Sequence, residues 1–339
     1  MEPRIGILRD NIFLEHKTGY DHPESPSRLR SIYRMLDRDY PEDYIYISPE
    51  SASIEQIELV HSPSYIDKVL KTADHLFSTL SPDTPVSSLS YKAAFYAVGG
   101  CIKIVQLLVD RKLDMGIALI RPPGHHALKD RASGFCIFNN LAITARYLIN
   151  KGIKRILIID YDVHYGNGIA QEFYTEEEVL YISTHDLRLF PYSGDWKEIG
   201  KGRGEGYTIN IPLGRSTDSE ILFLLYDRVL KGIFKNYRPS FVMIAAGFDA
   251  HRDDPIGRFQ VDERFYGWIT RLVLELKKEI PLMMVLEGGY DPTVNSLCVK
   301  EILKSLRGLN RAPEVESHPQ LERYLKVLYK IHKGFGLIE

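Results

Sequence analysis

With 339 residues, of which 44% are apolar and 26% charged, the chain has the composition of a globular protein with ample material for a large core. Its formal net charge of -2 excludes a general electrostatic attraction to nucleic acid or to anionic membranes. The cysteines Cys101, Cys136 and Cys298 are too widely spaced for a disulfide framework or a cysteine zinc site, and we expect them to be buried in a reducing compartment.

The N-terminal residues lack the basic start and the apolar stretch that are typical of a signal peptide. No window approaches 18 consecutive apolar residues, which is about the length that a membrane-spanning helix needs. We therefore predict a cytoplasmic protein that binds neither membrane nor nucleic acid.

Short apolar runs alternate with longer amphipathic stretches along the whole chain. The predicted strands are Ile5–Leu8, Tyr44–Ile47, Gly116–Ile120, Arg155–Asp160, Val179–Ser183, Tyr207–Ile211, Phe241–Ala246 and Pro281–Leu286. The predicted helices are Pro26–Leu36, Ser90–Val109, Leu141–Asn150, Ser219–Lys235, Glu263–Glu279 and Asn295–Leu306. Several strands are apolar on both faces, which favours a mainly parallel sheet covered by helices on both sides. Because no repeat or linker divides the chain, we predict a single α/β domain over residues 1–339.

Chemically reactive residues follow five of the predicted strands. The segments concerned are Arg121–Ala127, Asp160–Gly168, Thr184–Asp186, Gly247–His251 and Glu287–Asp291. In open parallel sheets the loops at the carboxyl ends of the strands converge, and ligands bind there. The sequence therefore predicts an active site at this edge of the sheet.

The segment after the fourth predicted strand carries two carboxylates and an imidazole. If its backbone stays extended, Asp160, Asp162 and His164 project to one side because side chains alternate. Two carboxylates and an imidazole suit a divalent cation such as zinc. The alternative is a capped strand end with ordinary surface acids. The turn at residues 166–168 favours the site, because its glycines allow the backbone to approach closely.

Asp249 lies just beyond a strand that is apolar up to Ala246. A carboxylate so close to the core needs a partner that offsets its desolvation. That partner is either structural, as in a helix N-cap or an ion pair with Arg252, or it is a metal ion. As a third protein ligand, Asp249 would leave a fourth position open for water, which is the arrangement of catalytic zinc sites.

Two further segments have both a catalytic and a structural interpretation. His125 and His126 follow a Pro-Pro-Gly turn, and beside a metal they become candidates for a general base and an electrostatic partner. Elsewhere such a pair is a surface or core contact. Tyr290 follows two glycines that could turn its hydroxyl toward a substrate carbonyl, or its ring could simply pack.

The ordered set of motifs resembles the zinc-dependent histone deacetylases and their bacterial relatives, the acetylpolyamine amidohydrolases and acetoin-utilisation proteins. The likeness runs from about residue 5 to about residue 310. It is carried by the segments His22–Arg28, Arg121–Ala127, Ser133–Cys136, Asp160–Gly168, Ile182–His185, Gly247–Pro255 and Leu286–Tyr290. The resemblance implies the arginase/deacetylase fold, an eight-stranded mainly parallel sheet flanked by helices.

The same resemblance implies the roles of the site residues. The zinc ligands would be Asp162, His164 and Asp249, and Tyr290 would donate a hydrogen bond to the substrate carbonyl oxygen. The remaining roles belong to two histidines and their partners. His126 would be the general base and His125 the electrostatic histidine, with Asp160 and Asn167 hydrogen-bonded to them. One branch of the family has aspartate where this chain has Asn167, so we expect His126 to be less strongly polarised here.

The resemblance also implies a narrow acyl-lysine tunnel and a second cation. Gly134, Phe135 and Phe190 match positions that line the tunnel, although Phe190 could also be a core aromatic residue. Asp83 matches an acidic residue of the rim that grips substrate amide groups. A structural potassium ion would be bound through Asp160, Asp162, His164 and Ser183.

The function implied is zinc-dependent hydrolysis of an N-acetylated lysine, an N-acetylated polyamine or another small acylated amine, with release of acetate. The sequence does not choose among these substrates, and it leaves assembly into homo-oligomers open. Two other functions stay open. An arginase-like ureohydrolase would need two metal ions and a second acidic cluster, whereas a non-catalytic acyl-ligand-binding protein would bind acetyl-lysine without turnover.

Overall fold

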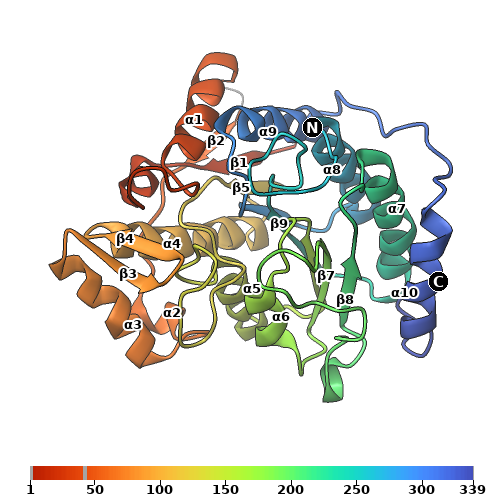
Figure 1. Ribbon diagram of the computed structural model, residues 1–339, viewed down its shortest axis with the longest axis horizontal. Coiled ribbons are helices and arrows are strands. Elements are labelled where there is room, and N and C mark those ends of the chain that lie inside the picture. The colour runs from red at the N-terminus through yellow and green to blue at the C-terminus, as the bar shows by residue number, and fades with distance from the viewer. Residues whose placement is uncertain (1–2, 41–43, 339) are drawn as a thin grey trace.

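The fold is built on one large parallel sheet. The computed structural model describes residues 3–40 and 44–338. Eight strands lie in the order β2-β1-β5-β10-β9-β6-β7-β8, and every recorded pair is parallel (Figure 1). The strands are β1 (Ile5–Leu8), β2 (Ile45–Ile47), β5 (Met115–Ala118), β6 (Ile156–Asp160), β7 (Val179–His185), β8 (Thr208–Pro212), β9 (Phe241–Ala246) and β10 (Leu282–Leu286).

Helices cover both faces of this sheet, so the fold has three layers (Figure 1). One layer is formed by α1 (Ser27–Asp39), α7 (Ser219–Asn236), α8 (Glu263–Lys277), α9 (Pro292–Leu306) and α10 (Leu321–His332). The other layer contains α2 (Ile54–Ile57), α4 (Ser90–Val109), α5 (Asn140–Asn150) and α6 (Asn167–Phe173), with α3 (Pro63–Leu70) nearby. All the residues of the central strands are buried, as expected for a parallel sheet between two helical layers.

The predicted fold class is confirmed, and all eight predicted strands are present with ends that differ by at most two residues. The sequence analysis missed the short helices α2, α3 and α6 and the C-terminal helix α10. It also missed an antiparallel hairpin of β3 (Phe77–Ser81) and β4 (Thr84–Ser87), which lies outside the main sheet. The hairpin strands carry many small polar residues, so their hydrophobic alternation is weak.

Among the described helices, only α4 is long and apolar enough to cross a membrane by length and composition. In its most apolar window, 61% of the residues are buried inside the fold. This burial is what a core helix requires, because both its flank toward the sheet and its flank toward α5 need apolar contacts. The three cysteines are free and buried, as the sequence predicts.

The packing of α4 depends on a glycine. A Cβ atom on Gly99 would lie 2.1 Å from the carbonyl oxygen of Glu50 and 2.6 Å from the backbone nitrogen of Ala52. That nitrogen donates a hydrogen bond to the carbonyl oxygen of Phe95, one turn earlier on α4. The neighbouring chain therefore lies directly against the helix backbone, and no side-chain rotation could make room.

We expect Gly99→Ala to destabilise the protein by about 1–3 kcal/mol, although alanine normally stabilises a helix interior by roughly 1 kcal/mol relative to glycine. Urea unfolding measures this change in the free energy of unfolding. Gly214→Ala serves as the control, because a Cβ there meets no atom within 4 Å. Equal midpoints for the Gly99→Ala and wild-type proteins would contradict the close approach.

Candidate metal centre and active site

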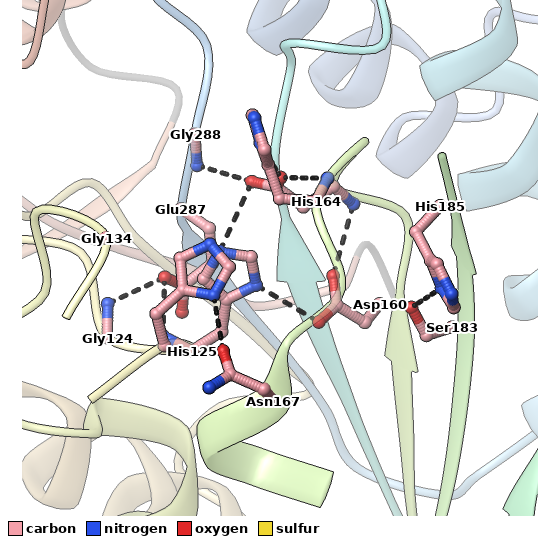
Figure 2. A network of polar contacts seen from close by, with 12 residues as sticks. Gly124, His125, Gly134, Asp160, His164, Asn167, Ser183, His185, Glu287 and Gly288 are labelled. Atoms are coloured by element: carbon pink, nitrogen blue, oxygen red, sulfur yellow. Dashed lines mark hydrogen bonds and ion pairs between the residues drawn. The ribbon is translucent and has the colours of Figure 1, made fainter. Parts of the chain in front are cut away.

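The loops after β5, β6, β7, β9 and β10 meet at the carboxyl edge of the sheet, as the sequence predicts. Figure 2 shows residues from the segments after β5, β6 and β10 close together, with His125 in contact with Asp160 and Glu287 beside Gly124. The strands β5, β10, β9, β6 and β7 are neighbours in the sheet, so their loops reach a common centre.

The segment after β6 is not extended, so the prediction of simple alternation is wrong. β6 ends at Asp160, and the chain then turns twice. Asp160 Oδ1 accepts a hydrogen bond from the backbone nitrogen of Asp162 at 3.1 Å, and Asp162 Oδ1 accepts one from that of His164 at 2.8 Å. Aspartate side chains favour such bonds to the amide two residues later, and these bonds bend the backbone. The turns still bring Asp162 and His164 into the same centre.

Asp162, His164 and Asp249 form a group whose ligand atoms all lie within 4.8 Å of one another. His164 Nδ1 lies 3.0 Å from Asp162 Oδ1 and 3.1 Å from Asp249 Oδ2. Both carboxylates are fully buried, and the imidazole is nearly so. Asp249 also accepts a hydrogen bond from the backbone nitrogen of Val163 at 2.8 Å, whereas no contact of its carboxylate with Arg252 is recorded among the described residues. Of the structural partners considered for Asp249, the ion pair with Arg252 is therefore not formed.

Two glycines form the walls of this group. A Cβ on Gly247 would lie 2.1 Å from Asp162 Oδ2, and a Cβ on Gly288 would lie 2.0 Å from Asp249 Oδ2. The backbone nitrogen of Gly288 also donates to Asp162 Oδ2 at 2.8 Å (Figure 2). The carboxylates are thus enclosed by backbone, and only residues without a side chain fit beside them.

The electrostatics of this group favour a cation. Burial and the charge of Asp162 raise the pKa of Asp249 to about 7. Burial likewise disfavours ionisation of Asp162, but His125 and His164 outweigh it and lower the pKa of Asp162. Two buried carboxylates so close together need positive charge, and two oxygens with one imidazole nitrogen are a donor set that divalent cations accept. The residues therefore fit a metal ion.

His125 lies between two buried carboxylates. Its Nδ1 is 3.2 Å from Asp160 Oδ2, and its Nε2 is 3.7 Å from Asp162 Oδ2. Burial opposes protonation, but the charges of Asp162 and Asp160 outweigh it and raise the pKa of His125 to about 10. Asp160 is itself oriented by the hydroxyl of Tyr181, which donates to Oδ2 at 2.8 Å. The predicted pairing of Asp160 with a histidine is present.

His126 has the opposite electrostatic character. Its Nδ1 lies 2.8 Å from the side-chain oxygen of Asn167. Burial, together with the nearby imidazoles of His125 and His164, holds the pKa of His126 well below its usual value. Because the amide oxygen can only accept, Nδ1 carries the hydrogen and Nε2 is left with a free lone pair. His126 is thus a neutral imidazole with its basic nitrogen away from Asn167.

Tyr290 is fixed by its backbone and by its ring. Gly289, with φ +106, lets the chain turn after β10. The backbone nitrogen of Tyr290 donates to Asp254 Oδ2 at 2.6 Å, and the guanidinium of Arg28 lies 4.9 Å from the ring centre. Burial and the charge of Asp249 hold the pKa of the Tyr290 phenol well above its usual value, so the hydroxyl keeps its proton.

A buried ion cluster ties the N-terminal segment to this loop. Arg28 donates to the carbonyl oxygens of Glu287 and Gly289 and forms an ion pair with Glu24 at 2.8 Å. Arg121 donates to the same Glu24 carboxylate, with Nε to Oε1 at 2.6 Å. Glu24 and the two arginines are fully buried. Burial opposes ionisation of Glu24, but Arg121, His16 and Arg28 outweigh it and lower its pKa to about 2.

The predicted tunnel residues lie around the two catalytic candidates. The ring of Phe190 lies 5.0 Å from that of His126, and the ring of Phe135 lies 5.7 Å from that of Tyr290, centre to centre. A Cβ on Gly134 would lie 2.4 Å from the His126 ring and 2.8 Å from that of Phe190. Asp83 is in the β3–β4 turn, where its Oδ2 accepts from the backbone nitrogen of Gly134 at 3.0 Å. Asp83 therefore positions the wall residue Gly134.

Ser183, the remaining predicted residue, lies beside Asp160 on the neighbouring strand. Its hydroxyl is 2.9 Å from His185 Nδ1 (Figure 2). The carbonyl oxygen of Asp160 accepts a hydrogen bond from the hydroxyl of Tyr226 at 3.1 Å. These contacts do not test the potassium ion, which stays a prediction.

The sequence analysis did not assign a role to Glu287. Its Oε2 accepts hydrogen bonds from the backbone nitrogens of Gly124 and His125, at 2.7 and 3.1 Å, and so holds the histidine loop against β10. Burial raises its pKa to about 7. A glutamate that directly follows five apolar strand residues was the available signal, because such a carboxylate must find buried partners.

Known proteins resemble this chain along most of its length. The model of the histone deacetylase domain matches residues 22–306. A probable deacetylase of Archaeoglobus fulgidus is 34% identical, and the alignment covers 84% of this chain and 81% of that protein. A probable deacetylase of Methanothermobacter thermautotrophicus is 36% identical, and the alignment covers 88% of this chain and 92% of that protein. A crystal structure of the HDA15 HD domain superposes with a TM-score of 0.92 at 32% identity and covers 98% of this chain and 95% of that chain.

Some relatives are longer. Histone deacetylase 5 of Arabidopsis thaliana is 31% identical, and the alignment covers 96% of this chain but only 53% of that protein. The chain therefore spans about half the length of this relative.

We expect Glu24→Gln to destabilise the protein by about 3–5 kcal/mol at pH 7, because it leaves two buried arginines without their shared anion. Since the folded-state pKa of Glu24 is lowered, its contribution is present above pH 4.5 and is lost as the pH falls toward about 2. Urea unfolding of both proteins between pH 7 and pH 3 measures this difference. Glu15→Gln, at a partly exposed pair with Lys17, is the control and should change stability by less than about 1 kcal/mol. If the difference in free energy of unfolding between the wild-type and Glu24→Gln proteins stayed the same from pH 7 to pH 3, the role of Glu24 would be contradicted.

Proposed function

The chain belongs to the histone deacetylase family, and we propose that it is a zinc-dependent deacetylase that hydrolyses the amide of an N-acetylated lysine or small amine and releases acetate. One observation carries this proposal. Asp162, His164 and Asp249 converge within 4.8 Å next to a neutral histidine and a protonated tyrosine. This is the set of groups that metal-assisted amide hydrolysis requires.

Asp162, His164 and Asp249 would hold the zinc ion. Two carboxylates and one imidazole leave a further position open, which is typical of catalytic rather than structural zinc. When bound, zinc would act as a Lewis acid that polarises the carbonyl and makes water more acidic. The glycines at 247 and 288 allow this approach, because a side chain at either position would collide with the carboxylate oxygens.

His126 acts as the general base. Its Nε2 takes a proton from the attacking water and later returns one to the leaving amine. Asn167 holds the hydrogen on Nδ1 at 2.8 Å and thereby fixes the tautomer that this role needs. Because Asn167 is neutral, it stabilises the protonated form of His126 less than a carboxylate would, and a proton gained by His126 is easily passed on.

His125 and Tyr290 stabilise the charge that develops on the substrate. His125, protonated between Asp160 and Asp162, keeps a positive charge beside the reacting centre. The Tyr290 hydroxyl donates a hydrogen bond to the carbonyl oxygen as that oxygen becomes an anion. Asp254 and Arg28 fix the tyrosine before the substrate arrives, so little reorganisation is needed.

Gly134, Phe135 and Phe190 would surround the chain that carries the acyl group. Aromatic walls accept a methylene chain through apolar contact, and they exclude branched groups by their shape. Gly134 lies against both Phe190 and His126, so any side chain at this position would fill the approach to the base. Asp83 would act on the substrate path by holding Gly134 in place.

We expect Tyr290→Phe to lower kcat by about 100- to 1000-fold, since a single preorganised donor to the developing anion is removed. Hydrolysis of an acetyl-lysine peptide measures the rate, and elemental analysis measures bound metal. Tyr192→Phe, on an exposed ring near Phe190, is the matched control and should retain full activity. Wild-type turnover by the Tyr290→Phe protein with its metal retained would overturn the assignment.

Dialysis against a chelator should abolish activity, and zinc should restore it. We expect one ion per chain in the wild type, and Asp249→Asn should lower the metal content well below that, because it removes a charged ligand. The control is Asp253→Asn, four residues along the same loop and exposed to solvent. Unchanged metal content in the Asp249→Asn protein would refute the ligand set.

The same measurements decide between the alternatives. Two bound ions per chain would favour a ureohydrolase. Tight binding of acetyl-lysine without turnover would favour a non-catalytic binding protein. The second group of described residues that could hold a metal combines His125, Cys136 and Glu287, and it lacks the carboxylate cluster that a two-metal ureohydrolase needs.

A further inference from the structure

A hollow lies at the opposite edge of the sheet from the metal centre. It has a volume of about 1680 Å³ and is lined by residues at the amino ends of β1, β5, β6, β9 and β10. These five strands are consecutive in the sheet. The C-terminal residues of α8 and α9 also line this hollow. No residue of the metal centre contributes to it.

The lining is strongly basic in a chain whose net charge is -2. Eight basic and two acidic side chains line the hollow. One acid, Asp114, forms an ion pair with Arg4 at 2.9 Å, and a further acid outside the lining, Glu275, pairs with Arg271 at 2.7 Å. An excess of positive charge remains after these pairs are counted.

Helix ends explain part of this charge. The C-termini of α4, α5, α8 and α9 all lie at this edge, and each carries about half a negative charge from its backbone dipole. Lys277 offsets the negative end of α8, because its ammonium donates hydrogen bonds to the carbonyl oxygens of Lys278 and Ile280 just beyond the helix. Four helix ends supply only about two negative charges in total, so they do not neutralise the lining.

Three of the remaining cations are exposed around the hollow. Arg111, Lys154 and Lys278 come from three separate connections, and no ion pair is recorded for their side chains among the described residues. The backbone at Arg111 and Lys278 has φ of +54 and +48, values that glycine adopts without strain. Basic side chains are therefore present at positions where the backbone favours a residue without any side chain.

We propose that this basic hollow binds a compact polyphosphate anion, either free or as the phosphate chain of a small organic molecule. The cations surround a concavity, so they can contact a small ligand from several sides at once. The chain as a whole has a net charge of -2 and no general attraction to nucleic acid or to an anionic membrane, so a local excess of positive charge in a concavity favours a small anion. The binding does not depend on the deacetylase activity, and it can be measured whether or not the chain turns over substrate.

The test is calorimetric titration of the 339-residue protein, loaded with zinc, with inorganic tripolyphosphate at low salt. We expect saturable binding of one anion per chain, weakened by added NaCl because the contacts are between charges. ATP is titrated in parallel. Tighter binding of tripolyphosphate would indicate a free polyphosphate, and tighter binding of ATP would indicate a phosphorylated organic ligand. Absence of saturable binding by both anions would overturn the proposal.

Charge reversal locates the site. The double variant Arg111→Glu/Lys278→Glu should weaken tripolyphosphate binding by tenfold or more. Arg30→Glu/Arg215→Glu, at two exposed positions outside the hollow, is the matched control and should bind like the wild type. The single variant Lys154→Glu should also weaken binding, which keeps the test valid if the double variant is poorly folded.

Two results would overturn the location or the ligand class. Equal loss of binding in the control variant would mean that the anion senses only overall charge. Binding of a 20-nucleotide single-stranded DNA or of poly-glutamate that tripolyphosphate fails to displace would assign the surface to a macromolecule instead.

Discussion

The arrangement of the metal centre depends on the free-energy cost of burying two carboxylates at the carboxyl edge of the sheet. Asp162 and Asp249 lie within 4.8 Å of each other and are fully removed from solvent. A buried anion is stable only when other charges or hydrogen-bond donors surround it. His164, the backbone nitrogens of Val163 and Gly288, and the proposed cation meet this need together. The glycines beside the carboxylates follow from the same requirement, because donors and a metal must approach closely.

Buried carboxylates farther from the metal centre are also surrounded by charged groups or hydrogen-bond donors. Glu287 holds the histidine loop through two backbone nitrogens, and Glu24 holds Arg28 and Arg121. Arg28 in turn reaches the loop that carries Tyr290. Segments that are more than 250 residues apart in the chain are thereby fixed relative to each other. A small shift in one of these buried contacts would move His125 or Tyr290, and the catalysis that we propose depends steeply on their positions.

The two histidines show how neighbouring groups acquire opposite roles. His125 and His126 are adjacent in the chain, and their rings lie 4.0 Å apart. Carboxylates face the first ring, whereas an amide faces the second, so the first keeps a proton and the second keeps a lone pair. The same sheet shows a similar contrast on a larger scale, with carboxylates gathered at its carboxyl edge and cations at its amino edge.

The sequence by itself determined the strands, most of the helices and the edge at which the reactive residues gather. These features follow from local hydrophobic patterns and from the rule that parallel strands point their carboxyl ends in one direction. It also predicted Asp162, His164 and Asp249 as the ligands of one metal ion, and the structure brings their ligand atoms within 4.8 Å of one another. Only the tertiary structure decided that Asp249 meets Val163, that Glu24 joins Arg121, and that five strand ends create a basic hollow. Such contacts join residues far apart in the chain, and their partners are selected by packing and desolvation, which no local pattern records.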